Sequence, residues 1–160
     1  MHESVMTWVQ AKKVEYGLDG PLHTLEVGSF DVNGSARGLF DQTNYTGIDI
    51  ADGPGVDMVL SSHELNGHFL VDSFDLVVST EALEHDSNPW LTVGQVWDVL
   101  KPGGLYIVTA RGNSFGEHNP PDYYRFLPAG MQVLLEQAGF QVLEVSEDPQ
   151  VSGVFAVGRK

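Results

Sequence analysis

Three side chains suited to acid–base or metal chemistry follow one apolar run of the chain. Glu81, Glu84 and His85 come directly after the strand-like run 74–79, at positions i, i+3 and i+4. We expect a helix to begin there, and this spacing would place the three on one helix face. His118 follows a later apolar run. Two carboxylates and two imidazoles are therefore expected to meet in one cleft.

Two kinds of chemistry fit this set of four residues. As divalent-metal ligands, they would hold a metal that lowers the pKa of a hydroxyl group and orients it. Without a metal, the two acids would stabilise a helix N-terminus, and a histidine would line the pocket. A histidine there also suits a general base, because imidazole exchanges a proton near neutral pH. Both interpretations stay open at this point.

A glycine turn and an acidic residue earlier in the chain are typical of nucleoside binding. The strand-like run Thr24–Val27 contains Glu26 and leads into Gly28, and a second run, Tyr45–Ile50, contains Asp49. In a Rossmann-like sheet the glycine lets the backbone approach a ligand, and the second-strand carboxylate accepts the ribose hydroxyls. A simple strand-ending turn and a surface carboxylate are the plainer interpretations of Gly28 and Asp49.

Taken in order, these segments resemble the class I S-adenosylmethionine (SAM) dependent methyltransferases. The most specific feature is Leu-Lys-Pro-Gly-Gly at 100–104, a turn before the strand Leu105–Ala110. The resemblance runs from about Leu22 to the last residue. It implies an α/β, Rossmann-like fold with a mostly parallel seven-stranded sheet in the order 3-2-1-4-5-7-6. The last strand would be antiparallel, and helices would cover both faces.

The resemblance also implies where SAM binds, at the carboxyl ends of the first four strands. Glu26 would lie near the methionine amino group, and Asp49 would take both ribose hydroxyls. Other residues would line the methionine or the adenine of SAM: Gly28, Ser29, Phe30, Ile50, Ser62, His63, Ser79 and Thr80.

The pattern Glu-x-x-Glu-His is similar to one in polyprenyl-quinone and small-RNA 3′-end 2′-O-methyltransferases. In both groups it helps hold a metal that binds the acceptor, although relatives without a known metal also carry it. The resemblance implies that Glu81, Glu84, His85 and His118 are catalytic, and it allows a divalent metal as a further cofactor. The loop 122–126 is rich in aromatic and charged residues. It could hold an acceptor through its Tyr or Arg side chains, or it could be a packed loop with one ion pair.

The implied activity is methyl transfer to an O or N nucleophile of a small molecule or of a group on a larger partner. Two alternatives remain: a SAM-binding module without catalysis, and a Rossmann-type NAD-dependent oxidoreductase. The 160-residue chain is too short to add a substrate domain, which disfavours the oxidoreductase.

Periodicity and turn residues predict the remaining elements of a single domain, 1–160, with an N-terminal helix and turn at 1–20 and a core at 21–160. We expect Asn33 to cap the short helix, a loop to replace the second crossover helix, and Gly139 to end the last helix. In chain order these are a helix at 2–17, a short helix at 35–40, the loop 51–55, a strand at 56–60, helices at 89–100 and 128–138, and strands at 141–146 and 151–157.

Composition narrows the possible partners. The net charge is −14, from 22 acidic and 8 basic residues. Such a surface repels phosphate backbones, so we expect no nucleic-acid partner. We see no apolar run long enough to cross a membrane and no leader-like start, so we expect a cytoplasmic protein. The chain contains no cysteine, which excludes disulfides and thiolate metal sites.

Overall fold

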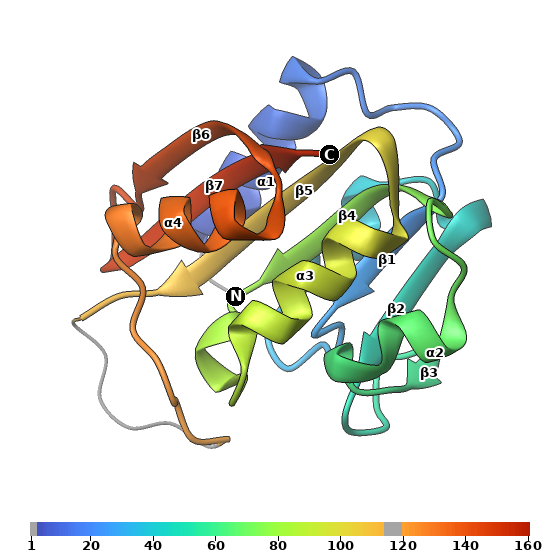
Figure 1. Ribbon diagram of the computed structural model, residues 1–160, viewed down its shortest axis with the longest axis horizontal. Helices are drawn as coiled ribbons and strands as arrows, with labels where there is room; N and C mark the ends of the chain where they lie inside the picture. The colour runs from blue at the N-terminus through green and yellow to red at the C-terminus, as the bar shows by residue number, and fades with distance from the viewer. Residues whose placement is uncertain (1–2, 114–119) are drawn as a thin grey trace.

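The computed structural model describes residues 3–113 and 120–160, which form a seven-stranded sheet in the order β3-β2-β1-β4-β5-β7-β6 (Figure 1). Strands β1 to β5 are parallel, and β7 lies antiparallel between β5 and β6. The predicted order and the antiparallel last strand are therefore confirmed. The strands are β1 (Thr24–Val27), β2 (Tyr45–Asp49), β3 (Met58–Val59), β4 (Phe74–Thr80), β5 (Leu100–Arg111), β6 (Gln141–Glu147) and β7 (Gly153–Arg159).

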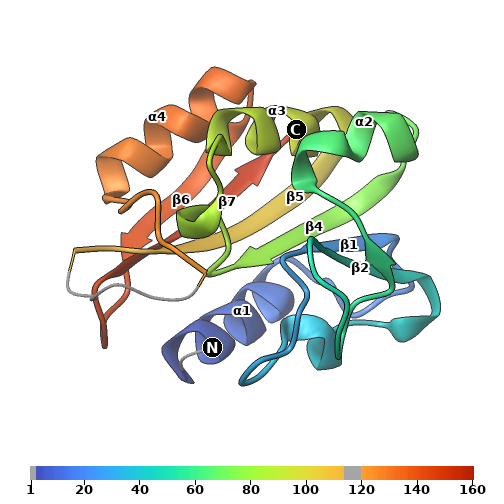
Figure 2. The same ribbon diagram turned by 90° about the horizontal axis from the view of Figure 1, so that it is seen from below.

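Helices cover both faces of the sheet, as predicted (Figure 2). One face carries α1 (Glu3–Glu15) and the 3₁₀ turn η1 (Ala36–Leu39), and the other carries α2 (Leu65–His68), α3 (Pro89–Val99) and α4 (Pro128–Ala138). Side chains of β4 alternate between the two hydrophobic clusters: Leu76 and Val78 pack in the α1 cluster, and Val77 packs in the α3 cluster. A buried central strand therefore needs apolar residues at successive positions.

None of the helices in the described part of the chain is long and apolar enough to cross a membrane.

The segment between β1 and β3 has little regular helix. The predicted short helix is a 3₁₀ turn, and its N-cap is Ser35 instead of Asn33, because the Ser35 side chain accepts the Arg37 N–H at 3.0 Å. Gly34 has φ +119°, a conformation that suits glycine and breaks the chain just before the cap. The loop at 51–55 is confirmed, and β3 is shorter than predicted.

The Pro-Gly-Gly turn lies inside β5 as an irregular stretch. Phe74 pairs with Leu100 and Leu76 pairs with Leu105, so residues 101–104 loop out opposite Asp75. Their positions are held by Lys101, whose Nζ lies 2.7 Å from Asp75 Oδ1. Strand β5 therefore begins earlier than predicted. The turns η3 (Ser62–Glu64) and α2, between β3 and β4, were not predicted.

Candidate active site

The carboxylate of Asp49 is aligned by backbone groups at the end of β2. Its Oδ2 accepts the N–H of Phe30 at 3.3 Å, and its Oδ1 accepts the N–H of Ala51 at 3.1 Å. A carboxylate oxygen can accept two hydrogen bonds, so each oxygen keeps room for a further donor. This geometry suits the predicted role of Asp49, which is to take two ribose hydroxyls.

Glu26, on β1, is a buried carboxylate with only 1% of its surface exposed. Both of its oxygens lie 3.5 Å from the hydroxyl of Ser35. Burial raises the pKa of the Glu26 carboxyl to about 7, although Tyr45, Arg37 and Ser35 oppose the rise. A cation brought next to Glu26 would favour its charged form.

Gly28 allows two loops at this edge to touch. It has φ +79°, and a Cβ on it would lie 2.5 Å from the Cβ of Ala82, in the turn after β4. The next residue, Ser29, is buried. The Phe30 ring covers Gly53, whose lack of a side chain makes room for it. The loop at 51–55 therefore folds back onto the loop after β1.

The residues predicted to flank the adenine lie in two different environments. Ser62 accepts a hydrogen bond from the Thr92 hydroxyl at 2.8 Å, and His63 Nε2 lies 2.6 Å from Asp86 Oδ1. These contacts tie η3 to the turn after β4 and to α3. Ile50 is 74% exposed and forms an open apolar surface beside Asp49.

Ser79 and Thr80, at the end of β4, are both buried. Thr80 pairs with Thr109 of β5. These two residues therefore belong to the packed end of the sheet. Their predicted contacts with the methionine end of SAM remain predictions.

The prediction of a helix directly after the run 74–79 is wrong. Only Leu83–His85 forms a 3₁₀ turn, η4, and Glu81 has φ +52°, outside any right-handed helix. The Glu81 N–H donates to the Thr109 carbonyl at 3.0 Å, so pairing with β5 continues past β4. The regular helix starts later, at Pro89, where Asn88 supplies the cap. The side chains of Glu81, Glu84 and His85 therefore do not share one helix face.

Glu81 and Glu84 both face Arg111, at the end of β5. Arg111 Nη2 lies 3.3 Å from Glu81 Oε2, and Arg111 Nε lies 3.6 Å from Glu84 Oε1. The Glu84 side chain is fully buried, and this burial is the main cause that raises its pKa to about 7. Glu81 adds to the rise, and Arg111 opposes it.

The predicted divalent metal does not fit these residues. A guanidinium already sits between the two glutamates, and its charge repels a metal cation. Within residues 3–113 and 120–160, no group of three or more His, Asp or Glu side chains could hold a metal ion. His118, the fourth predicted member of the set, lies outside the described residues.

His85 instead contacts the segment that follows β5. Its Nδ1 lies 3.2 Å from the Pro121 carbonyl oxygen and 2.9 Å from Asp122 Oδ1. Asp122 also forms an ion pair with Arg125. The loop therefore is packed and holds an ion pair, one of the two possibilities that its composition left open. Asp122 belongs to the charged loop 122–126 that the sequence pointed to, but its contact with His85 was not predicted.

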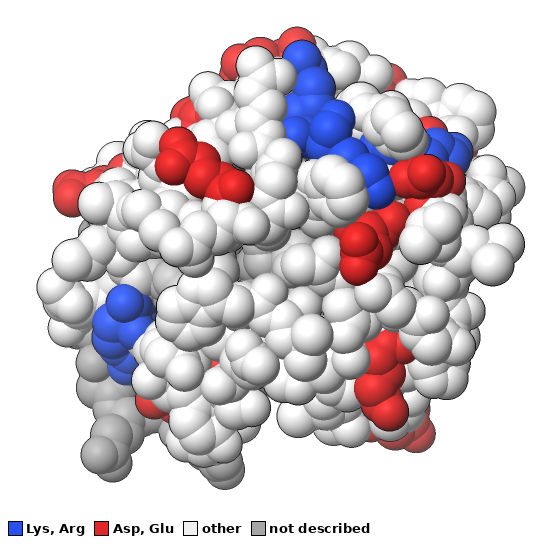
Figure 3. All heavy atoms as spheres, viewed as in Figure 1, with Lys and Arg blue, Asp and Glu red and all other residues white. Residues whose placement is uncertain are grey.

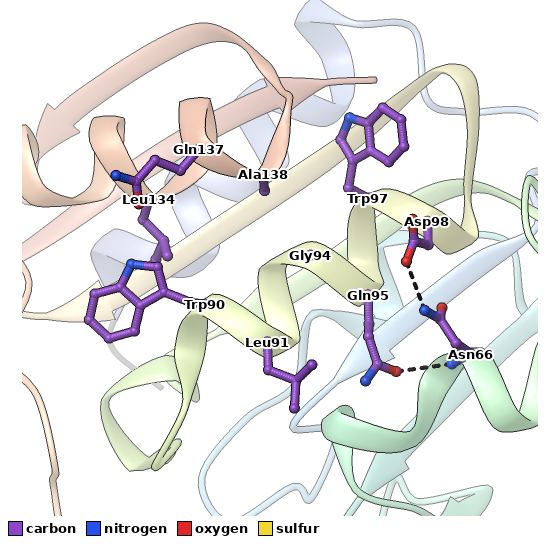
Figure 4. Close-up of a pocket in the computed structure, with 10 residues that line it drawn as sticks. All are labelled: Asn66, Trp90, Leu91, Gly94, Gln95, Trp97, Asp98, Leu134, Gln137 and Ala138. Carbon is purple, nitrogen blue, oxygen red and sulfur yellow. Dashed lines mark hydrogen bonds between the residues drawn. The ribbon is translucent and has the colours of Figure 1, made fainter.

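A groove lies away from these loops, between α3 and α4, with a volume of about 640 Å³ (Figure 4). Trp90, Leu91, Trp97 and Leu134 are among the residues that line it. None of the predicted site residues that the structure describes lines it. On the face of the molecule that carries these two helices, acidic and basic side chains form small separate groups on a mainly uncharged surface (Figure 3).

Comparisons with known proteins identify the family and the fold. A family model described as a methyltransferase domain matches residues 25–108, just over half of the chain. No curated protein sequence matches the chain.

Several solved structures share the fold at low sequence identity. One is the 1,6-didemethyltoxoflavin-N1-methyltransferase of Burkholderia thailandensis, at TM-score 0.77 and 18% identity, covering 99% of this chain and 79% of that one. The [4+2]-cyclase SpnF matches at TM-score 0.75 and 18% identity, covering 98% and 80%. A SAM-dependent methyltransferase from Mesorhizobium loti matches at TM-score 0.72 and 16% identity, covering 97% and 98%.

The sheet order also separates this chain from dinucleotide-binding oxidoreductases, whose usual order is 3-2-1-4-5-6 without an antiparallel insertion. The oxidoreductase alternative is therefore not supported. The chain belongs to the methyltransferase-domain family and has the class I, Rossmann-like fold of SAM-dependent methyltransferases.

Proposed function

We propose that this protein binds SAM at the carboxyl ends of β1 and β2 and transfers its methyl group to an O or N nucleophile. The observation that carries the proposal is the arrangement of Asp49, whose two oxygens are aligned by backbone N–H groups and still have free acceptor capacity. Its position at the end of the second strand of a methyltransferase-domain sheet matches a ribose-binding carboxylate.

The other predicted SAM-binding residues would contact the remaining parts of the cofactor. Glu26 would bind the methionine ammonium, because a buried carboxylate without an ion pair among the described residues is stabilised by a cation. Phe30 and Ile50 would offer apolar surface beside the ribose site. Ser62 and His63 would border the adenine from η3.

When bound, SAM supplies an already activated methyl group on a sulfonium. The protein's contribution is therefore to position the acceptor and to exclude water. The acceptor would be a small molecule or a group on a larger partner. In this proposal Glu81 and Glu84 act through Arg111 by fixing the end of β5 against the turn after β4, instead of contacting a metal.

One experiment separates methyl transfer from the alternatives. Isothermal titration with SAM and with S-adenosylhomocysteine measures binding, and tritiated SAM with a panel of phenols, catechols and N-heterocycles measures transfer. We expect binding of both ligands and transfer to at least one acceptor class. Binding without any transfer would favour a SAM-binding module or another reaction on this fold, since SpnF is a cyclase. No binding would contradict the proposal.

A further inference from the structure

The turn after β4 holds one imidazole nitrogen between two oxygen atoms. His85 Nδ1 lies 3.2 Å from the Pro121 carbonyl oxygen and 2.9 Å from Asp122 Oδ1. A carbonyl oxygen and an ionised carboxylate can only accept, so the proton of the neutral ring belongs on Nδ1. Nε2 is then the basic nitrogen, and no residue in the described ranges hydrogen-bonds to it.

The segment that supplies these oxygens is fixed to the turn that carries His85. The N–H groups of Tyr123 and Tyr124 donate to the Glu84 carbonyl at 2.7 and 3.2 Å. The Asp122 side chain is only 4% exposed, and Arg125 forms an ion pair with its second oxygen. Asp122 therefore lies between two basic side chains, and its buried carboxylate acts on His85 through its charge.

The same turn lies against the proposed SAM site. The His85 N–H donates to the Ala82 carbonyl at 3.1 Å, and Ala82 is the residue that packs on Gly28. His85 therefore belongs to a turn that touches the loop proposed to run along the methionine. Its side chain is 27% exposed, so a bound molecule can reach it.

We propose that Asp122, held by Arg125, is a positioning residue that keeps His85 in the Nδ1–H tautomer, so that Nε2 takes the proton of the methyl acceptor. This inference rests on the proposed methyl transfer and narrows its substrate class. The acceptor must carry an O–H or N–H proton that it loses during transfer, as a phenol, a catechol or a ring N–H does.

The acceptor oxygen or nitrogen forms a bond to the methyl carbon while the carbon–sulfur bond of SAM breaks. S-adenosylhomocysteine leaves, and the acceptor proton passes to Nε2 of His85. The imidazolium then returns that proton to water. The Asp122 carboxylate stabilises the imidazolium while it exists and orients the ring beforehand.

The test uses the full chain and the variant Asp122→Asn, which preserves shape and removes the charge. Asp75→Asn is the matched control. Asp75 also pairs with a cation, Lys101, but it lies near the start of β4, at the opposite end of the strands from the proposed site. With tritiated SAM and a phenol, a catechol and an N-heterocycle as probes, we expect Asp122→Asn to lower kcat about 100-fold, the usual worth of an oriented general base. The control should keep the wild-type kcat, and the Kd for SAM should not change in either variant.

A second readout does not depend on turnover. Long-range ¹H–¹⁵N correlation spectra, assigned by comparison with His85→Gln, report which ring nitrogen carries the proton. We expect the Nδ1–H tautomer of His85 in the wild type and a larger share of the Nε2–H tautomer in Asp122→Asn, where only the Pro121 carbonyl still accepts the Nδ1 proton. Wild-type kcat in Asp122→Asn, or an Nε2–H tautomer in the unmodified protein, would overturn the inference. If the wild type binds SAM but methylates none of the probes, the proposed function fails for these acceptors, while the tautomer still decides the role of Asp122.

Discussion

Glu26 and Glu84 are buried carboxylates in two halves of the candidate site: the ends of β1 and β2, and the ends of β4 and β5. The two halves differ in whether the chain supplies a cation beside the carboxylate. Both side chains are buried, and burial raises the pKa of each carboxyl to about 7. Glu84 has Arg111 beside it and shares that cation with Glu81. Glu26 has long contacts to a hydroxyl, and the nearby Arg37 forms its ion pair with Asp57.

The difference indicates which half the fold completes by itself. The buried charge of the β4–β5 half is balanced within the chain, so it stabilises structure. The buried charge of the β1–β2 half lacks an ion pair within the described residues, so a ligand's cation can supply one. A strongly shifted pKa alone does not distinguish these two cases. They are distinguished by the charged groups that lie beside each carboxylate.

The largest expected effect is on stability, from removing the cation of the β4–β5 half. Arg111→Met leaves Glu81 and buried Glu84 together without their guanidinium. We expect the free energy of unfolding, measured by urea denaturation at pH 8, to fall by about 3 kcal/mol. The loss should shrink at pH 5, where Glu84 is protonated.

Arg37→Met is the matched control in the other half. Its ion pair with Asp57 is partly exposed, so we expect a loss of about 1 kcal/mol or less. Equal losses in the two variants would remove the contrast between the two halves.

The contact between the two halves can be tested at Gly28. Gly28→Ala places a Cβ against Ala82 and forces a left-handed backbone on alanine. We expect a loss of about 2 kcal/mol in unfolding free energy. Gly94→Ala, in the middle of α3 with nothing within 4 Å of the added carbon, should instead gain up to about 1 kcal/mol. A neutral Gly28→Ala would mean that the loops do not pack as described.

The two glutamates should differ in how they couple to SAM. Because their folded-state pKa values are raised above the ordinary 4.5, the protein without ligand loses stability as pH rises from about 4.5 to about 7. If SAM's ammonium pairs with ionised Glu26, binding releases a proton, and the Kd should be about tenfold weaker at pH 6 than at pH 8.

Isothermal titration at the two pH values checks this coupling. Glu26→Gln should abolish the pH dependence, and Glu84→Gln should retain it. If Glu84→Gln flattened the dependence and Glu26→Gln did not, the assignment of the two halves would be reversed.

The smallest expected effect concerns metal. Since Arg111 occupies the position between the two glutamates, EDTA should change neither the Kd for SAM nor the rate of transfer. Loss of transfer in EDTA that Mg²⁺ restores would show that the β4–β5 half binds a metal after all, through a different arrangement of these side chains.

Much of the fold could be predicted because local and long-range patterns agree. The strand β1, the loop at 51–55 and the helix that Pro128 opens and Gly139 closes all follow from residue type and turn chemistry. The complete strand order came from the family resemblance, since periodicity alone does not set which strands are neighbours. Strand β3 was overestimated because only two of its residues find partners on β2.

The placement of the candidate residues was predictable at the ends of β1 and β2 and less so after β4, while their contacts with SAM stay a prediction. The positions of Gly28 and Asp49 are fixed by adjacent strand ends, which sequence spacing describes well. The helix expected directly after residue 79 does not form, because the N–H of residue 81 still hydrogen-bonds to β5. This is a tertiary contact, which local helix propensity does not predict. Asp122 meets His85 across separate loops, and such a pair has no spacing signature in the chain.

The central claim is that Asp49 binds the ribose of SAM, and titration of SAM into Asp49→Ala tests it most directly. Asp52→Ala, which removes an exposed carboxylate from the same loop, is the control for lost charge. Circular dichroism should show that both variants are folded. We predict that Asp49→Ala weakens SAM binding by about 1.5–3 kcal/mol, the worth of hydrogen bonds to a charged group, and that Asp52→Ala leaves it unchanged. An unchanged affinity in folded Asp49→Ala would contradict the account.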